Sequence, residues 1–283
     1  AFLGIAAVGM TFVIISGGID LSVGAVIGFT TVLIAVLVMW AGLHPLVAFA
    51  VALGVSAAFG AAMGAAIHYL KVPSFIVTLA GMFLARGGAS VLSPDSIGIK
   101  HEFYTAVSKS YLLMPGGGRL SVVGLIMVAV FLAAILLAHR TRFGSYVYAL
   151  GGNETSAALM GVPVARTTIQ IYMLSSVLAG LAGIVFSLYT SAGYSLSALG
   201  VELDAIAAVV IGGTLLTGGY GFVAGTFIGV MLQGLVQTYI VFDGSLSSWW
   251  TKIVIGALLF MFIVLQRLIF TASAPNRKVL WKA

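Results

Sequence analysis

The sequence predicts an all-α polytopic membrane protein built from two inverted five-helix repeats. Apolar residues make up 61% of the 283-residue chain and Asp, Glu, Lys and Arg only 7%, against about 25% charged residues in a soluble domain. The apolar residues form blocks of roughly 18–25, long enough to cross a hydrocarbon core about 30 Å thick. Alternating ten-residue strands are absent, so we expect helices rather than a barrel to satisfy the backbone in lipid.

Composition also excludes several kinds of chemistry. The chain has no cysteine, which excludes thiol catalysis, cysteine-bound metals and disulfides. Its net charge of +6 indicates a charge bias in the loops of a membrane protein rather than nucleic-acid binding. No metal site is predicted, because the histidines are far apart in the sequence: His44, His68, His101 and His139.

Nine apolar segments follow one another, and each is predicted to be a membrane span. The predicted spans are 1–16, 22–40, 46–69, 74–92, 120–139, 166–189, 204–217, 222–240 and 250–268. The 204–217 segment is too short to cross alone, and two Gly-Gly pairs, 212–213 and 218–219, lie in or beside it. We expect it to be broken or re-entrant, and buried by protein.

Orientation follows from Lys and Arg, which concentrate on the cytoplasmic side. Two hydrophilic stretches, 93–119 and 140–165, are expected outside the bilayer. Placing 140–165 in the cytoplasm puts eight basic residues inside and four outside, with the C-terminal tail 269–283 inside. The inner residues are Lys71, Arg140, Arg142, Arg166, Arg267, Arg277, Lys278 and Lys282, and the outer ones are Lys100, Lys109, Arg119 and Lys252.

Residues 18–25 and 200–207 resemble each other. Each reads Gly, a branched aliphatic residue, an acid, Leu and a short polar residue, followed by a helix of small residues. The predicted orientation points the copies in opposite directions, as in inverted-repeat transporters; the alternative is a chance match between Gly/Ala-rich segments. Repeat one is then 1–92 and repeat two 120–268, in a single transmembrane domain, 1–283.

The unpartnered span 120–139 predicts one more helix before Ala1, and so ten spans in a full-length chain. The chain begins inside an apolar run and without Met, which fits this expectation.

Acidic residues close to the membrane are the first candidates for a functional site, since a central Asp costs roughly 2.5–3.5 kcal/mol on insertion scales. Asp20, Ser22, Glu202 and Asp204 lie at or near predicted helix starts. They either cap those helices, worth about 0.5–2 kcal/mol, or shape and gate a polar path. Arg86, inside a span, either faces protein or water or extends to the outer surface.

The 140–165 stretch contains a predicted surface helix at 153–161. Asn153 is a suitable N-cap, Glu154 lies in the first turn, and Gly161 with Pro163 ends the helix. The helix has an exposed apolar tip that a groove of a soluble partner could accept; an ordinary helix on the membrane surface is the alternative. Its candidate contact residues are Asn153, Glu154, Ala157, Leu159, Met160 and Gly161.

Enzyme motifs are absent from the sequence, and no catalytic residue is predicted. The chain has no phosphate-binding loop ending in Gly-Lys-Ser/Thr, no His-Glu-x-x-His and no Gly-x-Ser-x-Gly. We therefore expect neither ATP hydrolysis nor a bound cofactor in this chain.

Three segments in this order resemble the bacterial ribose/xylose-type permeases of ATP-binding cassette importers. They are residues 17–24 (GGIDLSVG), 148–154 (YALGGNE) and 200–207 (GVELDAIA) continuing through Gly212-Gly213-Thr214. The resemblance covers essentially the whole chain. Residues 115–120 (PGGGRL) and 243–252 (DGSLSSWWTK) are similar to permeases of the galactofuranose importer. Permeases of this family begin with a cytoplasmic segment and a first helix that are not in this sequence, in agreement with the additional helix expected before Ala1.

The resemblance implies a permease that moves a monosaccharide, galactofuranose in this subgroup, across the bacterial inner membrane. It implies a periplasmic sugar-binding protein, a second permease subunit forming a heterodimer, and a cytoplasmic ATPase that uses ATP and Mg²⁺. Helix 153–161 would be the coupling helix that the ATPase receives.

Two other transport mechanisms also fit parts of the sequence. A secondary transporter driven by an ion gradient would explain the repeat and the buried acids, but not the surface helix. A channel is the weaker alternative, because no repeated filter-like segment is evident.

Overall fold

The computed structural model describes residues 1–113, 117–243 and 249–272. Parts of both galactofuranose-like segments, 115–120 and 243–252, and most of the tail 269–283 lie outside the described residues. The three basic residues of the tail that entered the topology argument, Arg277, Lys278 and Lys282, also lie outside them.

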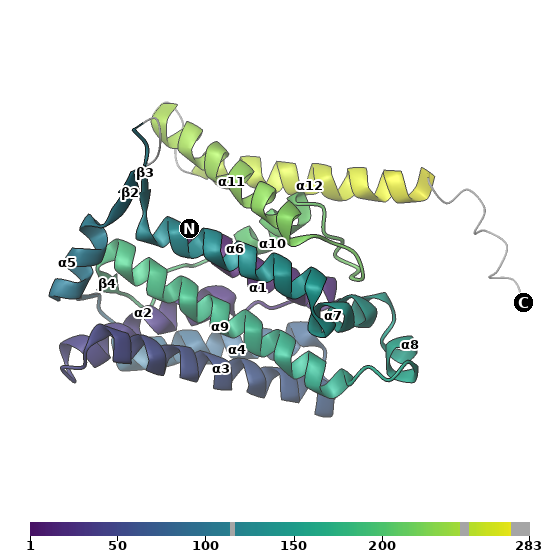
Figure 1. Cartoon of the computed structure of the whole chain (residues 1–283), viewed down its shortest axis with the longest axis horizontal. Helices are drawn as coiled ribbons and strands as arrows, with labels where there is room; N and C mark the ends of the chain where they lie inside the picture. The colour runs from purple at the N-terminus through teal and green to yellow at the C-terminus, as the bar shows by residue number, and fades with distance from the viewer. Residues whose placement is uncertain (114–116, 244–248, 273–283) are drawn as a thin grey trace, which may run out of the picture.

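Helices occupy all nine predicted positions (Figure 1). They are α1 (Phe2–Ile15), α2 (Val23–Met39), α3 (Pro45–Tyr69), α4 (Ser74–Leu92), α6 (Val122–Arg140), α9 (Val164–Thr190), α10 (Val201–Ile211), α11 (Val223–Asp243) and α12 (Trp249–Ala272). Within the described part of the chain, six of them, α3, α4, α6, α9, α11 and α12, are long and apolar enough to cross a membrane. Helices α1 and α2 are apolar but shorter, so the count of nine spans stays a prediction.

The short segment near residue 210 is broken, as the glycines indicated. Helix α10 has 11 residues and ends at Gly212. The chain then turns through glycines with positive φ at 213, 218 and 219 before α11 begins. Only a residue without a Cβ adopts these angles at low cost, so the glycines end α10 well short of a membrane thickness.

The two hydrophilic stretches contain helices and strands, of which only the surface helix at 153–161 was predicted from the sequence. The first contains α5 (Glu102–Lys109) and the strands β1 (Ile97–Gly98), β2 (Tyr111–Leu113) and β3 (Arg119–Ser121). Strand β1 pairs with β4 (Ala192–Gly193), and β2 pairs with β3, both antiparallel. The second stretch contains α7 (Arg142–Gly152) and α8 (Glu154–Leu159).

Helix α1 lies at the centre of the protein. Every residue from Gly4 to Ile15 is buried, and α1 packs against α6, α9, α10 and α11. A helix that is apolar on all sides is expected in such a position. The turn that follows its C-terminal end, which contains Asp20, therefore lies in the interior.

The two predicted halves exchange contacts. Helix α9 packs on α2 and α3, while α1 packs on α10 and α11. If α1 and α9 are equivalent, each contacts the two helices that follow its counterpart in the other half. This exchange supports the repeat, which stays a prediction.

Candidate functional site

Asp20 is completely buried in the turn between α1 and α2. Its Oδ1 accepts hydrogen bonds from the backbone N–H of Ser22 at 2.9 Å and from the Ser22 hydroxyl at 2.6 Å. Its Oδ2 accepts a hydrogen bond from the hydroxyl of Ser175 in α9 at 2.7 Å. Burial of a carboxyl is tolerated when its oxygens are bonded, and these bonds fix the start of α2 onto α9. The geometry of Asp20 and Ser22 is thus that of a helix anchor.

Glu202 differs from Asp20 although the two occupy matching sequence positions. It lies in the first turn of α10, and its buried Oε2 has no hydrogen-bond partner within the described residues. This oxygen lies directly against Gly24 of α2, where a Cβ would overlap it. A buried carboxylate oxygen without a hydrogen bond is energetically costly. It can therefore gain a hydrogen bond when the surrounding helices move.

Arg86 of α4 faces protein rather than the outer surface. Its Nη1 donates to the carbonyl oxygens of Ser195 and Ser197, each at 2.7 Å. Gly28, one turn after Gly24 on α2, leaves room for this guanidinium. The side chain is also close enough to Glu202 to interact with it electrostatically. One face of α2 therefore carries an acid and a base from two other helices.

Asp204 forms an ion pair at the edge of the bundle. The Lys252 Nζ lies 2.6 Å from its Oδ2 and 2.7 Å from its Oδ1. The backbone carbonyl of Asp204 accepts a hydrogen bond from Gln233 at 3.2 Å. Asp204 thus joins α10 to α11 and α12.

Helix α8 is capped as the sequence predicts. The Oδ1 of Asn153 accepts a hydrogen bond from the backbone N–H of Ser156 at 2.8 Å. Gly161 has a φ of 83°, and the N–H groups of Gly161 and Val162 donate to the carbonyls of Ala158 and Ala157, the pattern of a Schellman motif. The helix has six residues, about 9 Å long, so it is shorter than the nine residues expected.

The exposed surface of α8 is smaller than the sequence suggests. Leu159 and Met160 are 85% and 75% exposed, and Glu154 is also exposed. Ala157, however, is only 1% exposed and faces the protein's own core. The expectation that Ala157 contacts a partner is wrong, because on so short a helix the residue opposite the tip packs inward.

Three Gly-Gly pairs meet beside this region: 17–18, 151–152 and 218–219. Gly151, near the end of α7, lies against the carbonyl of Ile15, and Gly218 lies against Gly17. The N–H of Gly219 donates to the same Ile15 carbonyl at 2.8 Å. Sequence reasoning did not connect these pairs, although each is visible as a doublet. They place the α7–α8 region in direct backbone contact with the turns before α2 and after α10.

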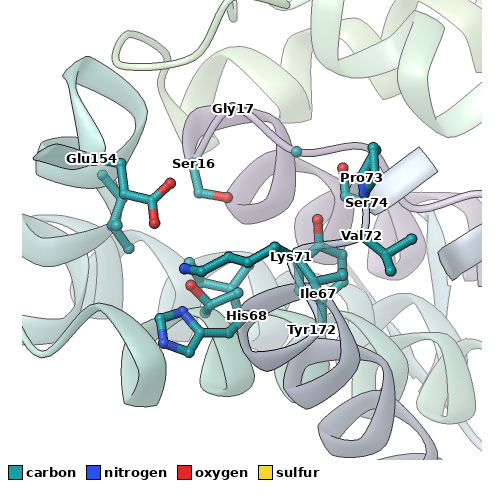
Figure 2. A pocket seen from close by; sticks show the side chains of 14 residues that line it. Ser16, Gly17, Ile67, His68, Lys71, Val72, Pro73, Ser74, Glu154 and Tyr172 are labelled. Carbon is teal, nitrogen blue, oxygen red and sulfur yellow. The ribbon is translucent and has the colours of Figure 1, made fainter. Parts of the chain in front are cut away.

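A cavity opens beside the turn between α1 and α2 (Figure 2). It lies among the α1–α2 turn, the corner between α3 and α4, the first turns of α9 and the start of α8. Lys71, His68, Glu154 and Ser16 contribute polar groups to its wall.

Comparison with known proteins gives one family. Residues 1–263 match the family described as "Branched-chain amino acid transport system / permease component". The chain is 64% identical over 267 residues to the inner membrane ABC transporter permease protein YjfF of Escherichia coli K12, covering 94% of this chain and 81% of the relative. It is 38% identical to the fructose import permease FruG of Bifidobacterium longum (98% and 83% covered) and to the ribose import permease RbsC of E. coli K12 (93% and 81%). No solved structure matches the chain.

Proposed function

Because the chain belongs to this family of transport-system permease components, we propose that it is the membrane-spanning permease subunit of an ATP-driven sugar importer. The observation that carries the proposal is the similarity, over more than 90% of the chain, to permeases named for ribose and fructose import. It is a multi-pass protein of the inner membrane, in keeping with its six long apolar helices and its 64% identity to an inner membrane permease.

The energy for transport comes from a separate subunit. The sequence has no phosphate-binding loop, so a cytoplasmic ATPase that uses ATP and Mg²⁺ acts through protein contact. The exposed tip of α8, Leu159 and Met160, is the contact that we assign to it. A periplasmic sugar-binding protein and a second permease subunit complete the importer.

Movement of α8 reaches the interior through backbone contacts. The end of α7 touches the carbonyl of Ile15 at Gly151, and Ile15 is followed by the turn that carries Asp20. Close-packed backbones have no soft side chains between them, so a displacement of α7 is passed on rather than absorbed.

We assign the gating of the path to the charged groups around α2. Glu202 lies against Gly24 and Arg86 against Gly28, one turn further along α2, and the buried Oε2 of Glu202 has no hydrogen-bond partner within the described residues. Asp20 and Ser22 hold the start of α2, and Asp204 holds α10 to α12 through Lys252. A shift of α10 relative to α2 changes the environment of both Glu202 and Arg86.

The substrate is a monosaccharide, and we propose galactofuranose. This finer assignment rests on the similarity of segments 115–120 and 243–252 to that subgroup, which also suggests a heterodimer of two different permeases. The test measures uptake of radiolabelled galactofuranose, ribose and fructose by the assembled importer, each in competition with the other two unlabelled sugars. The sugar that is taken up and that competes best is the substrate.

Reconstitution into proteoliposomes tests the transport mechanism. With the ATPase, the second permease and the binding protein present, we expect sugar uptake to require ATP and to persist when ionophores collapse the ion gradients. Uptake that continues without ATP and stops with ionophores would instead identify a secondary transporter.

A further inference from the structure

The cavity beside the α1–α2 turn has the size and lining of a ligand site. Its volume is about 300 Å³, at the lower end of the range for small-molecule sites. Figure 2 shows the Lys71 amine, the His68 ring, the Glu154 carboxylate and the Ser16 hydroxyl turned toward the same space. These groups come from three separate parts of the chain.

The two charged groups of the cavity are free to bind a ligand. Lys71 and Glu154 line the same cavity, yet no ion pair within 4.0 Å joins them among the described contacts. Both side chains are exposed. A ligand that offers an anion to Lys71 and hydroxyl donors to Glu154 would satisfy both groups at once.

Another wall of the cavity carries the hydroxyls of Tyr172 and Ser74. Tyr172 is 3% exposed, and its hydroxyl lies directly against Gly18. The Ser74 Oγ accepts a hydrogen bond from the backbone N–H of Ile19 at 3.3 Å. This bond holds Ser74 and close packing against Gly18 holds Tyr172, both without a ligand, so the wall is preorganised.

Lys71 is held in an unusual backbone conformation. Its φ is 56°, in the left-handed region that residues with a Cβ adopt at a cost. Pro73 follows two residues later and fixes the start of α4. The strained corner aims the Lys71 side chain into the cavity, and such strain is typical of functional positions.

We propose that this cavity binds a small phosphorylated sugar or polyol. Lys71 and His68 bind the phosphate. Glu154 and the hydroxyls of Ser16 and Thr168 form hydrogen bonds with the ligand hydroxyls. Glu154 is the first residue of α8, so the occupant ties α8 to the α3–α4 corner. On the proposed function, on which this consequence rests, the cavity is cytoplasmic and its ligand restrains coupling when phosphorylated sugar accumulates in the cell.

Binding is measured on the chain alone, in nanodiscs of phosphatidylcholine, by isothermal titration calorimetry. The probes are ribose 5-phosphate, ribose and inorganic phosphate. We expect ribose 5-phosphate to bind at least about tenfold more tightly than either of the others, since each lacks one half of the contacts. Equal binding of ribose, or no binding of ribose 5-phosphate at millimolar concentration, would overturn the proposal.

Substitutions at Lys71 locate the site. Lys71→Asn and Lys71→Gly both suit a positive φ and remove the amine. We expect each to lower the affinity for ribose 5-phosphate by about tenfold or more. Lys100→Asn, which removes a lysine from the first hydrophilic stretch, is the matched control and should bind as the unaltered chain does. Unchanged binding in both Lys71 variants would refute the assignment.

A lipid headgroup carries the same phosphate chemistry as the soluble ligand, so a second experiment distinguishes the two. If phosphatidylglycerol added to the nanodisc abolishes ribose 5-phosphate binding, the site belongs to the headgroup and the soluble ligand is rejected. In the assembled importer, ribose 5-phosphate on the ATPase side should inhibit ATP-driven uptake, and Lys71→Gly should keep uptake while losing that inhibition. If ribose 5-phosphate inhibits the unaltered importer and the Lys71→Gly importer equally, the regulatory role is rejected. If the importer shows no uptake at all, the proposed function is wrong, but the binding result still stands.

Discussion

The buried Oε2 of Glu202 in α10 lies directly against Gly24 in α2, so the acid of one predicted repeat contacts the matched helix of the other. No other residue type fits at position 24 without displacing the carboxylate. The contact joins the two sequence segments on which the predicted repeat rests, and it places Glu202 on the same face of α2 as Arg86, which lies against Gly28.

Gly24→Ala tests this contact. Its methyl group would overlap the Glu202 carboxylate, and overpacking of this kind typically costs about 1–3 kcal/mol. We expect a lower midpoint of thermal unfolding in detergent and slower sugar uptake. Gly54→Ala in α3 is the control, because a Cβ there meets nothing within 4 Å; equal behaviour of the two variants would contradict the packing argument.

Asp20→Ala tests the anchor between α2 and α9. It leaves the backbone N–H of Ser22 and the hydroxyl of Ser175 without their acceptor, and a buried unsatisfied polar group costs about 1–3 kcal/mol. Thermal unfolding should therefore shift down, less so for Asp20→Asn, which keeps one acceptor oxygen. Asp95→Ala removes an exposed acid and should leave the midpoint unchanged.

Glu202→Gln separates gating from anchoring. Because Oε2 has no hydrogen bond to lose, the neutral side chain should leave thermal stability nearly unchanged while removing the electrostatic interaction with Arg86. We expect transport to fall although the protein assembles normally. Normal uptake by this variant would show that the carboxylate serves only to start α10.

Apolar runs predicted the positions of the nine helices, because eight of them are long and the short one, near residue 210, is bounded by glycines. The break after α10 was also predictable, since four glycines interrupt it within eight residues. The capping of α8 by Asn153 followed from local hydrogen bonding between neighbours in the sequence. These features depend on short-range chemistry.

Features that depend on contacts between distant segments were not predictable from one sequence. The bond from Ser175 to Asp20 joins residues 155 positions apart, and nothing near Ser175 indicates it. Ala157 was misplaced for the same reason, since its burial depends on how α8 packs against the rest of the chain. Helix α7 was missed because its two terminal glycines and its polar first turn are typical of a loop.

The topology is testable by labelling, since the chain has no native cysteine. Ser156 and Ser108 are both exposed and lie in the two hydrophilic stretches, 140–165 and 93–119. With the predicted orientation, an impermeant thiol reagent added from the periplasmic side should label Ser108→Cys and spare Ser156→Cys. The reverse pattern would invert the orientation and place α8 away from any cytoplasmic ATPase.

Coupling through α8 is best tested at its exposed tip rather than at Ala157, where Ala157→Arg would disturb the protein's own packing. Leu159 is 85% exposed, so Leu159→Arg leaves the fold intact and places a charge where an apolar side chain would enter a groove of the ATPase. A desolvated charge without a partner costs several kcal/mol, so we expect co-purification with the ATPase, and stimulation of hydrolysis by binding protein and sugar, to fall by about tenfold or more. Ser108→Arg adds the same charge to α5 in the other hydrophilic stretch and should change neither. Normal association and normal stimulation in Leu159→Arg would mean that the ATPase receives another part of the chain, and the exposed surface of α7 would be the next region to substitute.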